Sequence, residues 1–111
     1  MADDAAENAE LALTTTREGT TALIAVVGEL DASSAPGLED LAERLRSDGC
    51  VTFTLDMSQT TFIDSSGLRS MLALHTTVAK SGTGALSLQS PSDPVARLLA
   101  ITGLTEHFTI T

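Results

Sequence analysis

Two neighbouring serines behind an aspartate are the residues best suited to chemistry in this sequence. They stand in the run FIDSSG at residues 62–67, where an apolar pair gives way to polar side chains and then to a helical pattern. A helix N-terminus offers free N–H groups and the positive end of the helix dipole, so a phosphate at this helix start is tolerated or favoured. Gly67 is expected to leave space for a partner. The simpler interpretation, that Asp64 and Ser65 only cap the helix, stays open.

A second polar segment, GELD at residues 28–31, follows an earlier predicted strand. In open α/β sheets, sites lie beyond the carboxyl ends of the parallel strands, where neighbouring loops converge. We therefore expect Asp31 and Ser65 at the same edge of a sheet, with the Asp31 carboxylate facing a partner. The next helix has its own candidate caps in Ser33 and Ser34, so its backbone is not expected to need that carboxylate.

The other reactive side chains form no pattern typical of an enzyme or a metal site. His75 and His107 have no Asp or Cys at metal-ligand spacing. The sequence has no G-x-S-x-G elbow, no G-x-x-x-x-G-K-[ST] phosphate loop and no early acidic cluster of the kind a phosphoacceptor-aspartate domain needs. We therefore predict no enzymatic activity, no metal and no cofactor. The chain is expected to accept phosphate from ATP only through another protein.

Composition narrows the classes of partner and compartment. With a formal net charge of −9, the chain lacks the cationic stripe that nucleic acid or an anionic membrane requires. No stretch reaches the ~18 apolar residues of a membrane span, and residues 1–10 are acidic and unlike a signal peptide. We expect a cytoplasmic protein with a flexible acidic tail over 1–10 and one folded domain over 11–111.

Strands alternate with helices along that domain. Strand-like runs lie at 11–16, 21–27, 51–57, 85–88 and 107–110, and helical patterns lie between Ser34 and Gly49, from about Ser66 to Lys80, and from Asp93 to Gly103. The order β-β-α-β-α-β-α-β implies right-handed crossovers and an α/β fold. Its sheet is expected to be mixed and mostly parallel, with four to five strands, helices packed on it and the first strand as an antiparallel edge.

Three stretches resemble the signature segments of STAS domains, which occur in sulphate transporters and anti-sigma factor antagonists. They are GELDASSAPGLEDLAERL, LDMSQTTFIDSSGLRSML and SPSDPVARLLAITGL, in the family's order and at matching spacing. The resemblance covers about residues 11–110 and implies a STAS-like fold. Its most specific part is DSSGL between a strand–loop and a helix.

The resemblance also implies a phosphorylation switch. In the antagonists, the serine directly after the aspartate, Ser65 here, is phosphorylated by a partner anti-sigma factor that is also an ATP-dependent serine kinase. The unphosphorylated protein holds the anti-sigma factor and frees the sigma factor, and a phosphoserine phosphatase resets the cycle. The predicted partner-binding residues are Asp31, which matches a family residue at the partner surface, and Asp64, Ser66, Gly67 and Arg69. Ser66 is the weaker candidate acceptor, and Arg69 fits either a partner contact or a solvated side chain.

Two further expectations concern assembly and the alternative function. The chain ends close to its last predicted strand, without the C-terminal helix that many relatives carry. This is expected to expose one sheet face and to favour a homodimer. The alternative to the sigma-factor role is a STAS scaffold subunit of a stress-signalling complex or of a lipid-transport system.

Overall fold

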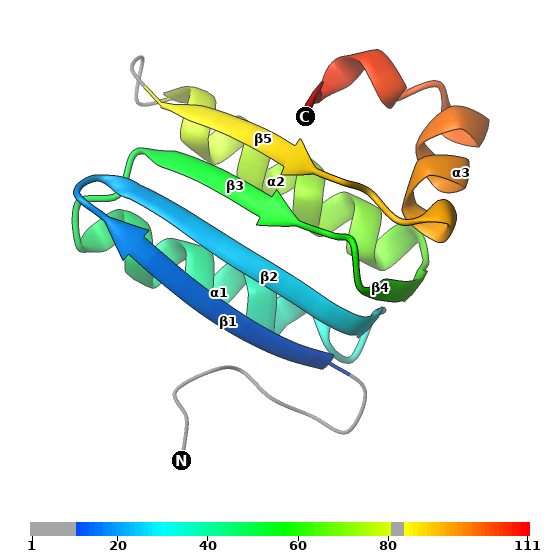
Figure 1. Cartoon of the computed structure of the whole chain (residues 1–111), viewed down its shortest axis with the longest axis horizontal. Coiled ribbons are helices and arrows are strands. Elements are labelled where there is room, and N and C mark those ends of the chain that lie inside the picture. Colours follow the sequence, from blue (N-terminus) through cyan, green and yellow to red (C-terminus); the bar gives the residue numbers. More distant parts are fainter. Residues whose placement is uncertain (1–10, 81–83) are drawn as a thin grey trace.

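The computed structural model describes residues 11–80 and 84–111 and has an α/β fold (Figure 1). Its strands are β1 (Leu11–Glu18), β2 (Thr21–Leu30), β3 (Thr52–Asp56), β4 (Thr60–Ile63), β5 (Ala85–Gln89) and β6 (Thr109–Ile110). Its helices are α1 (Ala35–Ser47), α2 (Ser65–Lys80) and α3 (Asp93–Thr102), followed by a short 3-10 helix η1 (Thr105–His107). Every strand and helix predicted from the sequence is present, with ends shifted by a few residues. The tail predicted for 1–10 lies outside the described residues.

The sheet is mixed and has one antiparallel edge. Within the described residues its strands follow the order β1-β2-β3-β5-β6, and β4 pairs with β2 off this path. β1 runs antiparallel to β2, with Leu11 opposite Gly28 and Glu18 opposite Thr21, whereas the remaining pairs are parallel. The predicted mixed, mostly parallel sheet with an antiparallel first strand is confirmed.

The short strand β4 was not predicted, so the described part of the sheet has six strands instead of four to five. Residues 21–25 of β2 pair with β3, and a register shift between Gly28 and Glu29 then lets the end of β2 pair with β4. A shift of this kind bends a strand and re-aims the residues that follow it. It brings the end of β2 against the segment that leads into α2.

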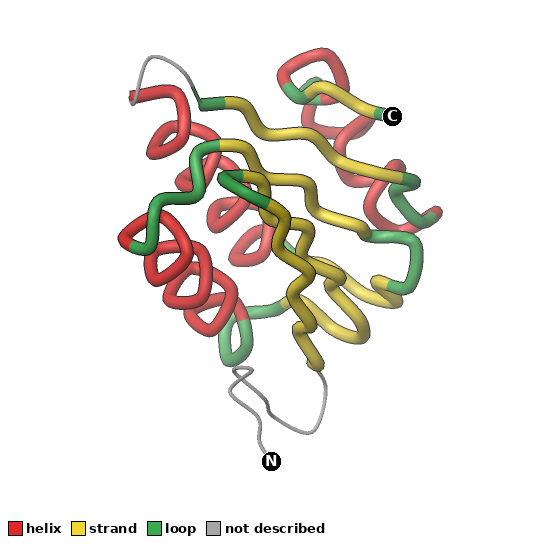
Figure 2. The backbone as a smooth tube through the Cα atoms, turned by 60° about the vertical axis from the view of Figure 1, so that its left-hand side comes forward, coloured by secondary structure: helices red, strands yellow, loops and turns green. Residues whose placement is uncertain are grey.

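α1 and α2 lie side by side against one face of the sheet (Figures 1 and 2). Alternate strand residues point to this face and meet the apolar stripes of the two helices. The side chains buried between these layers include Ile24, Val26, Leu38, Leu45, Phe53, Leu55, Met71, Leu74 and Leu88. No described helix lies over the opposite face of β1, β2 and β3 in Figure 1. None of the helices within 11–80 and 84–111 is long and apolar enough to cross a membrane.

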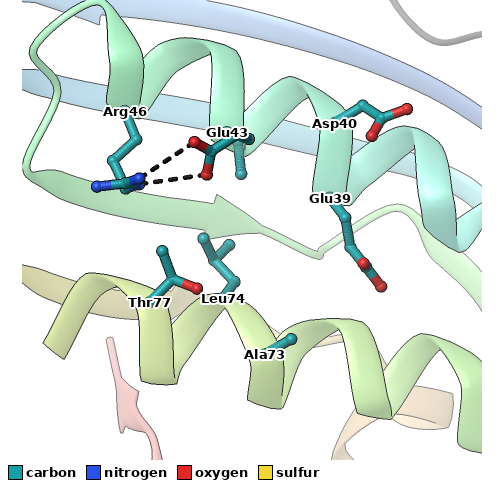
Figure 3. Close-up of a pocket in the computed structure, with 8 residues that line it drawn as sticks. Glu39, Asp40, Glu43, Arg46, Ala73, Leu74 and Thr77 are labelled. Carbon is teal, nitrogen blue, oxygen red and sulfur yellow. Dashed lines mark hydrogen bonds and ion pairs between the residues drawn. The ribbon is translucent and has the colours of Figure 1, made fainter. Parts of the chain in front are cut away.

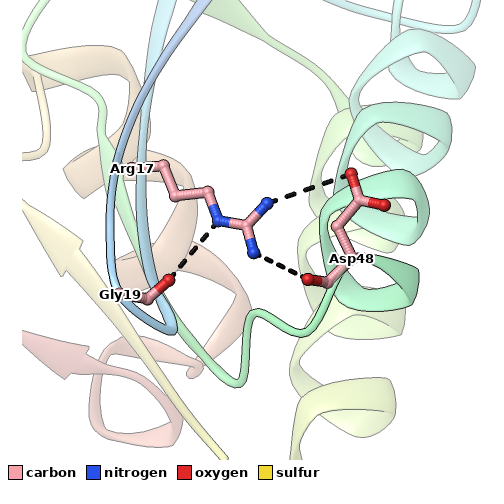
Figure 4. Close-up of polar contacts among 3 residues, drawn as sticks. All are labelled: Arg17, Gly19 and Asp48. Carbon is pink, nitrogen blue, oxygen red and sulfur yellow. Dashed lines mark hydrogen bonds and ion pairs between the residues drawn. The ribbon is translucent and has the colours of Figure 1, made fainter.

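Arg17 ties the β1–β2 hairpin to the end of α1 (Figure 4). Its guanidinium donates to the backbone oxygen of Asp48 at 2.6 Å and, more weakly, to that of Gly19 at 3.4 Å. The Asp48 carboxylate lies 3.9 Å away. A cation is favourable at this place because the last carbonyl groups of a helix carry the negative end of its dipole. The hairpin end of the sheet is thus held by structural contacts, and the polar motifs lie at the opposite end, where β2 and β4 finish.

Candidate functional site

The two polar segments selected from the sequence meet where β2 and β4 end. Leu30 and Ile63 are paired residues of these parallel strands, and the Asp64 backbone N–H donates to the Leu30 carbonyl oxygen at 3.4 Å. Asp31 and Asp64 therefore stand one residue past two adjacent strand ends. This is the convergence of the Asp31 and Ser65 segments that the sequence predicts.

The first turn of α2 separates the two interpretations of Asp64 and Ser65. One carboxylate oxygen of Asp64 accepts hydrogen bonds from the backbone N–H groups of Ser66, at 2.9 Å, and Gly67, at 3.2 Å. Asp64 is therefore the cap of the helix. Ser65 is the first residue of the helix, is exposed, and makes no side-chain hydrogen bond to any residue in the described part of the chain. Its hydroxyl is free to react without removing a contact from the fold.

Gly67 is buried against the strand ends. A Cβ atom at this position would lie 2.6 Å from the Leu30 carbonyl oxygen and 2.9 Å from side-chain carbons of Leu30 and Ile63. The expectation that Gly67 leaves space for a partner is wrong, because β2 and β4 fill that space. The glycine instead allows α2 to approach the sheet closely, and so it fixes where the first turn, with Ser65, emerges.

Asp31 holds the turn that leads into α1. One of its carboxylate oxygens accepts hydrogen bonds from the N–H groups of Ser33 and Ser34, both at 3.1 Å, and from the Ser33 hydroxyl at 2.9 Å. Ser34 precedes the helix, but its hydroxyl donates to the Glu29 backbone oxygen at 2.8 Å and caps nothing. The expectation that the backbone does not need the Asp31 carboxylate is wrong, since both serines proposed as caps are held by it.

Replacing Asp31 by alanine is expected to lower the melting temperature at pH 7, and the difference in melting temperature from wild type is expected to be smaller in acid. Hydrogen bonds, first of all from the Ser33 hydroxyl, lower the pKa of Asp31. A lowered pKa means that the stabilisation is present above the unfolded-state pKa and is lost as the pH falls through the folded-state value. Melting curves from pH 7 down to about pH 3 should show the gap to wild type narrowing below about pH 4.

Asp40→Ala is the control for this measurement, because Asp40 is an exposed α1 residue without a side-chain partner among the described residues. It should melt like wild type across the range. A gap for Asp31→Ala that stays constant with pH would show that the carboxylate charge contributes nothing to the turn.

Other side chains at this edge are exposed as well. Arg69 is exposed on α2 without an ion-pair partner in the described part of the chain, and Ser66 is half-buried. Glu29 and Phe62 are also exposed, and neither is among the site residues predicted from the sequence. The sequence contains a signal for this exposure. Glu29 and Phe62 each precede an apolar residue expected in the core, and successive strand residues face opposite sides, so both are expected to face away from the core.

A groove between α1 and α2 lies apart from this edge (Figure 3). Its volume is about 250 Å³, and it is lined by Glu39, Asp40, Ala42, Glu43, Arg46, Ala73, Leu74 and Thr77. Arg46 pairs with Glu43 at 3.1 Å, and Glu39 accepts a hydrogen bond from the hydroxyl of buried Ser70. None of the predicted site residues lines this groove, so it is not part of the Ser65 site.

The two histidines form a contact that the sequence could not show. The rings of His75 and His107 are 4.6 Å apart, and both pack against Phe108. These contacts join η1 and Phe108 to α2. Since His75 is ten residues from Ser65 along α2, about 15 Å, it cannot act as a base for that hydroxyl. No group of three or more metal-binding side chains occurs within the described ranges.

Comparison with known proteins agrees with this architecture. An anti-sigma factor antagonist from Mycobacterium paratuberculosis superposes with a TM-score of 0.78 at 24% identity, covering 90% of this chain and 84% of that one. SpoIIAA in its unphosphorylated form gives 0.76 at 22% identity, covering 90% and 88%. The Bacillus SpoIIAA in its phosphorylated form gives 0.70 at 20% identity, covering 90% and 91%.

No curated protein sequence matches the chain. The model of the STAS domain, however, matches residues 12–111. This match includes both strand ends, the Asp64 cap and all of α2, and it confirms the resemblance on which the family expectation was based. The chain belongs to the STAS domain family.

Proposed function

We propose that this protein is an anti-sigma factor antagonist whose unphosphorylated form binds an anti-sigma factor with serine kinase activity, and that phosphorylation of Ser65 switches this binding off. The observation that carries the proposal is the exposed hydroxyl of Ser65, which makes no hydrogen bond in the described structure while Asp64 beside it caps the helix. An acceptor of this kind can gain and lose a phosphate without the helix losing its cap.

The chemistry asked of this chain is small. The kinase transfers the γ-phosphoryl group of ATP to the Ser65 oxygen, which releases ADP and a proton. The chain supplies only the acceptor, since no histidine or metal-binding cluster in its described part lies at the hydroxyl. A phosphoserine phosphatase then hydrolyses the ester and restores the binding form. We expect the cycle to take place in the cytoplasm.

The solved structures of similar proteins and the exposure of the two serines support the proposal. The solved neighbours include anti-sigma factor antagonists, and SpoIIAA is described in both an unphosphorylated and a phosphorylated form. The family resemblance alone implies Ser65 as the acceptor, with Ser66 as the weaker candidate. Exposure adds a physical reason for the same order, because Ser65 is exposed and Ser66 is half-buried.

Phosphosite mapping tests the proposal. The test uses a kinase-type anti-sigma factor purified from the cells that make this protein, together with ATP and magnesium. It is expected to add one phosphate to the wild-type protein, at Ser65, as measured by peptide mass spectrometry. Ser65→Ala should accept none, and Ser66→Ala, the matched control one residue away, should accept one. Phosphate on Ser66, or an unmodified wild-type protein after prolonged incubation, would contradict the assignment.

A further inference from the structure

Phe62 is an exposed aromatic side chain in a protein that has very few. The chain contains three phenylalanines and no tryptophan or tyrosine. Phe53 and Phe108 are 0% and 5% exposed and belong to the core, whereas Phe62 is 46% exposed. Keeping a large apolar ring in water forgoes the gain from burying it. Aromatic residues are enriched in protein interfaces relative to the rest of the protein surface.

The strand β4 presents this ring at the Ser65 edge. Ile63, the next residue, is buried, so Phe62 points to the side of the strand away from the core. Its partner across the strands is Glu29, which is exposed as well. Because Phe62 is three residues before Ser65, their Cα atoms are at most about 11 Å apart. A partner that covers Ser65 with an ordinary interface of about 800 Å² per side has the reach to cover Phe62.

We propose that Phe62 is an apolar anchor that inserts into an apolar pocket of the anti-sigma factor; the inference rests on the proposed function above. Aromatic residues buried at the centre of an interface commonly supply a large share of its binding energy. The ring is uncharged, so its contribution does not depend on the phosphorylation state. Phe62 thus supplies affinity, and Ser65 supplies the control over it.

Phe62→Ala is expected to weaken binding to the purified kinase-type anti-sigma factor at least tenfold in isothermal titration calorimetry. Phe62→Leu, which keeps an apolar side chain, should recover most of the affinity. Melting temperatures of both variants should stay within a few degrees of wild type because the ring is already half-exposed. Ile101→Ala is the matched control: it removes a side chain that is 75% exposed on α3, and it should leave the affinity unchanged.

Equal affinities of wild type and Phe62→Ala overturn the inference. A change in the sedimentation of the isolated protein, with no change in affinity for the anti-sigma factor, would assign Phe62 to a contact between copies of this chain and overturns it as well. Ser65→Glu keeps the two proposals apart, because a loss of affinity there beside an unchanged Phe62→Ala places the failure on Phe62 alone. If wild type binds no kinase-type anti-sigma factor, both proposals fall.

Discussion

Phosphorylation of Ser65 is expected to lower the affinity for the anti-sigma factor about a thousandfold, which corresponds to ~4 kcal/mol of binding free energy. The phosphate adds roughly −1.5 to −2 charges one residue after Asp64, in a chain whose net charge is already −9. The sequence predicts free N–H groups at this helix start, but in the structure those of Ser66 and Gly67 already donate to the Asp64 carboxylate and are not free for a phosphate. An interface fitted to a neutral hydroxyl therefore receives a dianion with no partner, and burying such a charge is costly.

Calorimetric titration of the anti-sigma factor with five forms of the protein measures this effect: unphosphorylated wild type, phosphorylated wild type, Ser65→Ala, Ser65→Glu and Thr76→Glu. Ser65→Ala should bind like the unphosphorylated wild type, since the hydroxyl makes no contact in the described fold. Ser65→Glu, with about half the charge of a phosphate, should lie between wild type and the phosphorylated form. Thr76→Glu puts the same charge on an exposed position further along α2 and should not change the affinity. Equal affinities of all five forms would remove the switch from Ser65.

Gly67→Ala is expected to lower the free energy of unfolding by about 2 kcal/mol, in the range that overpacking of a tight site costs. Its new methyl group would stand 2.6 Å from the Leu30 carbonyl oxygen, a backbone atom that cannot rotate away. Alanine is the better helix former, so the clash must outweigh a favourable change in propensity. Either α2 or the ends of β2 and β4 must move, and Ser65 moves with the helix.

Equilibrium unfolding in urea measures this cost, and Ser66→Ala is the matched control. That change adds the same residue type in the same helical turn, removes only a hydroxyl without a partner in the described structure, and should stay within about 0.5 kcal/mol of wild type. A Gly67→Ala midpoint equal to that of the control would show that the strand ends yield easily and that the close approach is not required.

Long periodic patterns made most of the fold predictable from the sequence. The apolar stripes of α1 and α2 and the β-branched run in β2 extend over enough residues to mark their element types. β4 has only four residues, TTFI, and its two polar residues precede its two apolar ones, so the sequence there shows no polar–apolar alternation. Its pairing also depends on the register shift after Gly28, a feature set by the tertiary structure and not by a local pattern.

The roles of individual side chains in the two motifs were less predictable. Asp31 and Ser34 are equally good capping types, and only the positions of their oxygens show that the aspartate accepts while the serine donates elsewhere. The sequence predicts that Gly67 leaves space for a partner, and no local pattern reveals its contacts with Leu30, which lies far from it in the sequence. The position of the site at the ends of adjacent strands was predictable, because it follows from the topology of an open α/β sheet.

In the DSSG turn, the residues that keep the helix in place are not the residue proposed as the acceptor. Asp64 caps and Gly67 permits the close approach, whereas Ser65 supports nothing else in the described structure. Ser65 can therefore be exchanged for threonine or tyrosine without a folding cost from lost contacts. If Ser65 is the acceptor, as proposed, the kinase to which the domain responds could be changed for synthetic signalling circuits by substitution at this one position, while the framework of the fold stays the same.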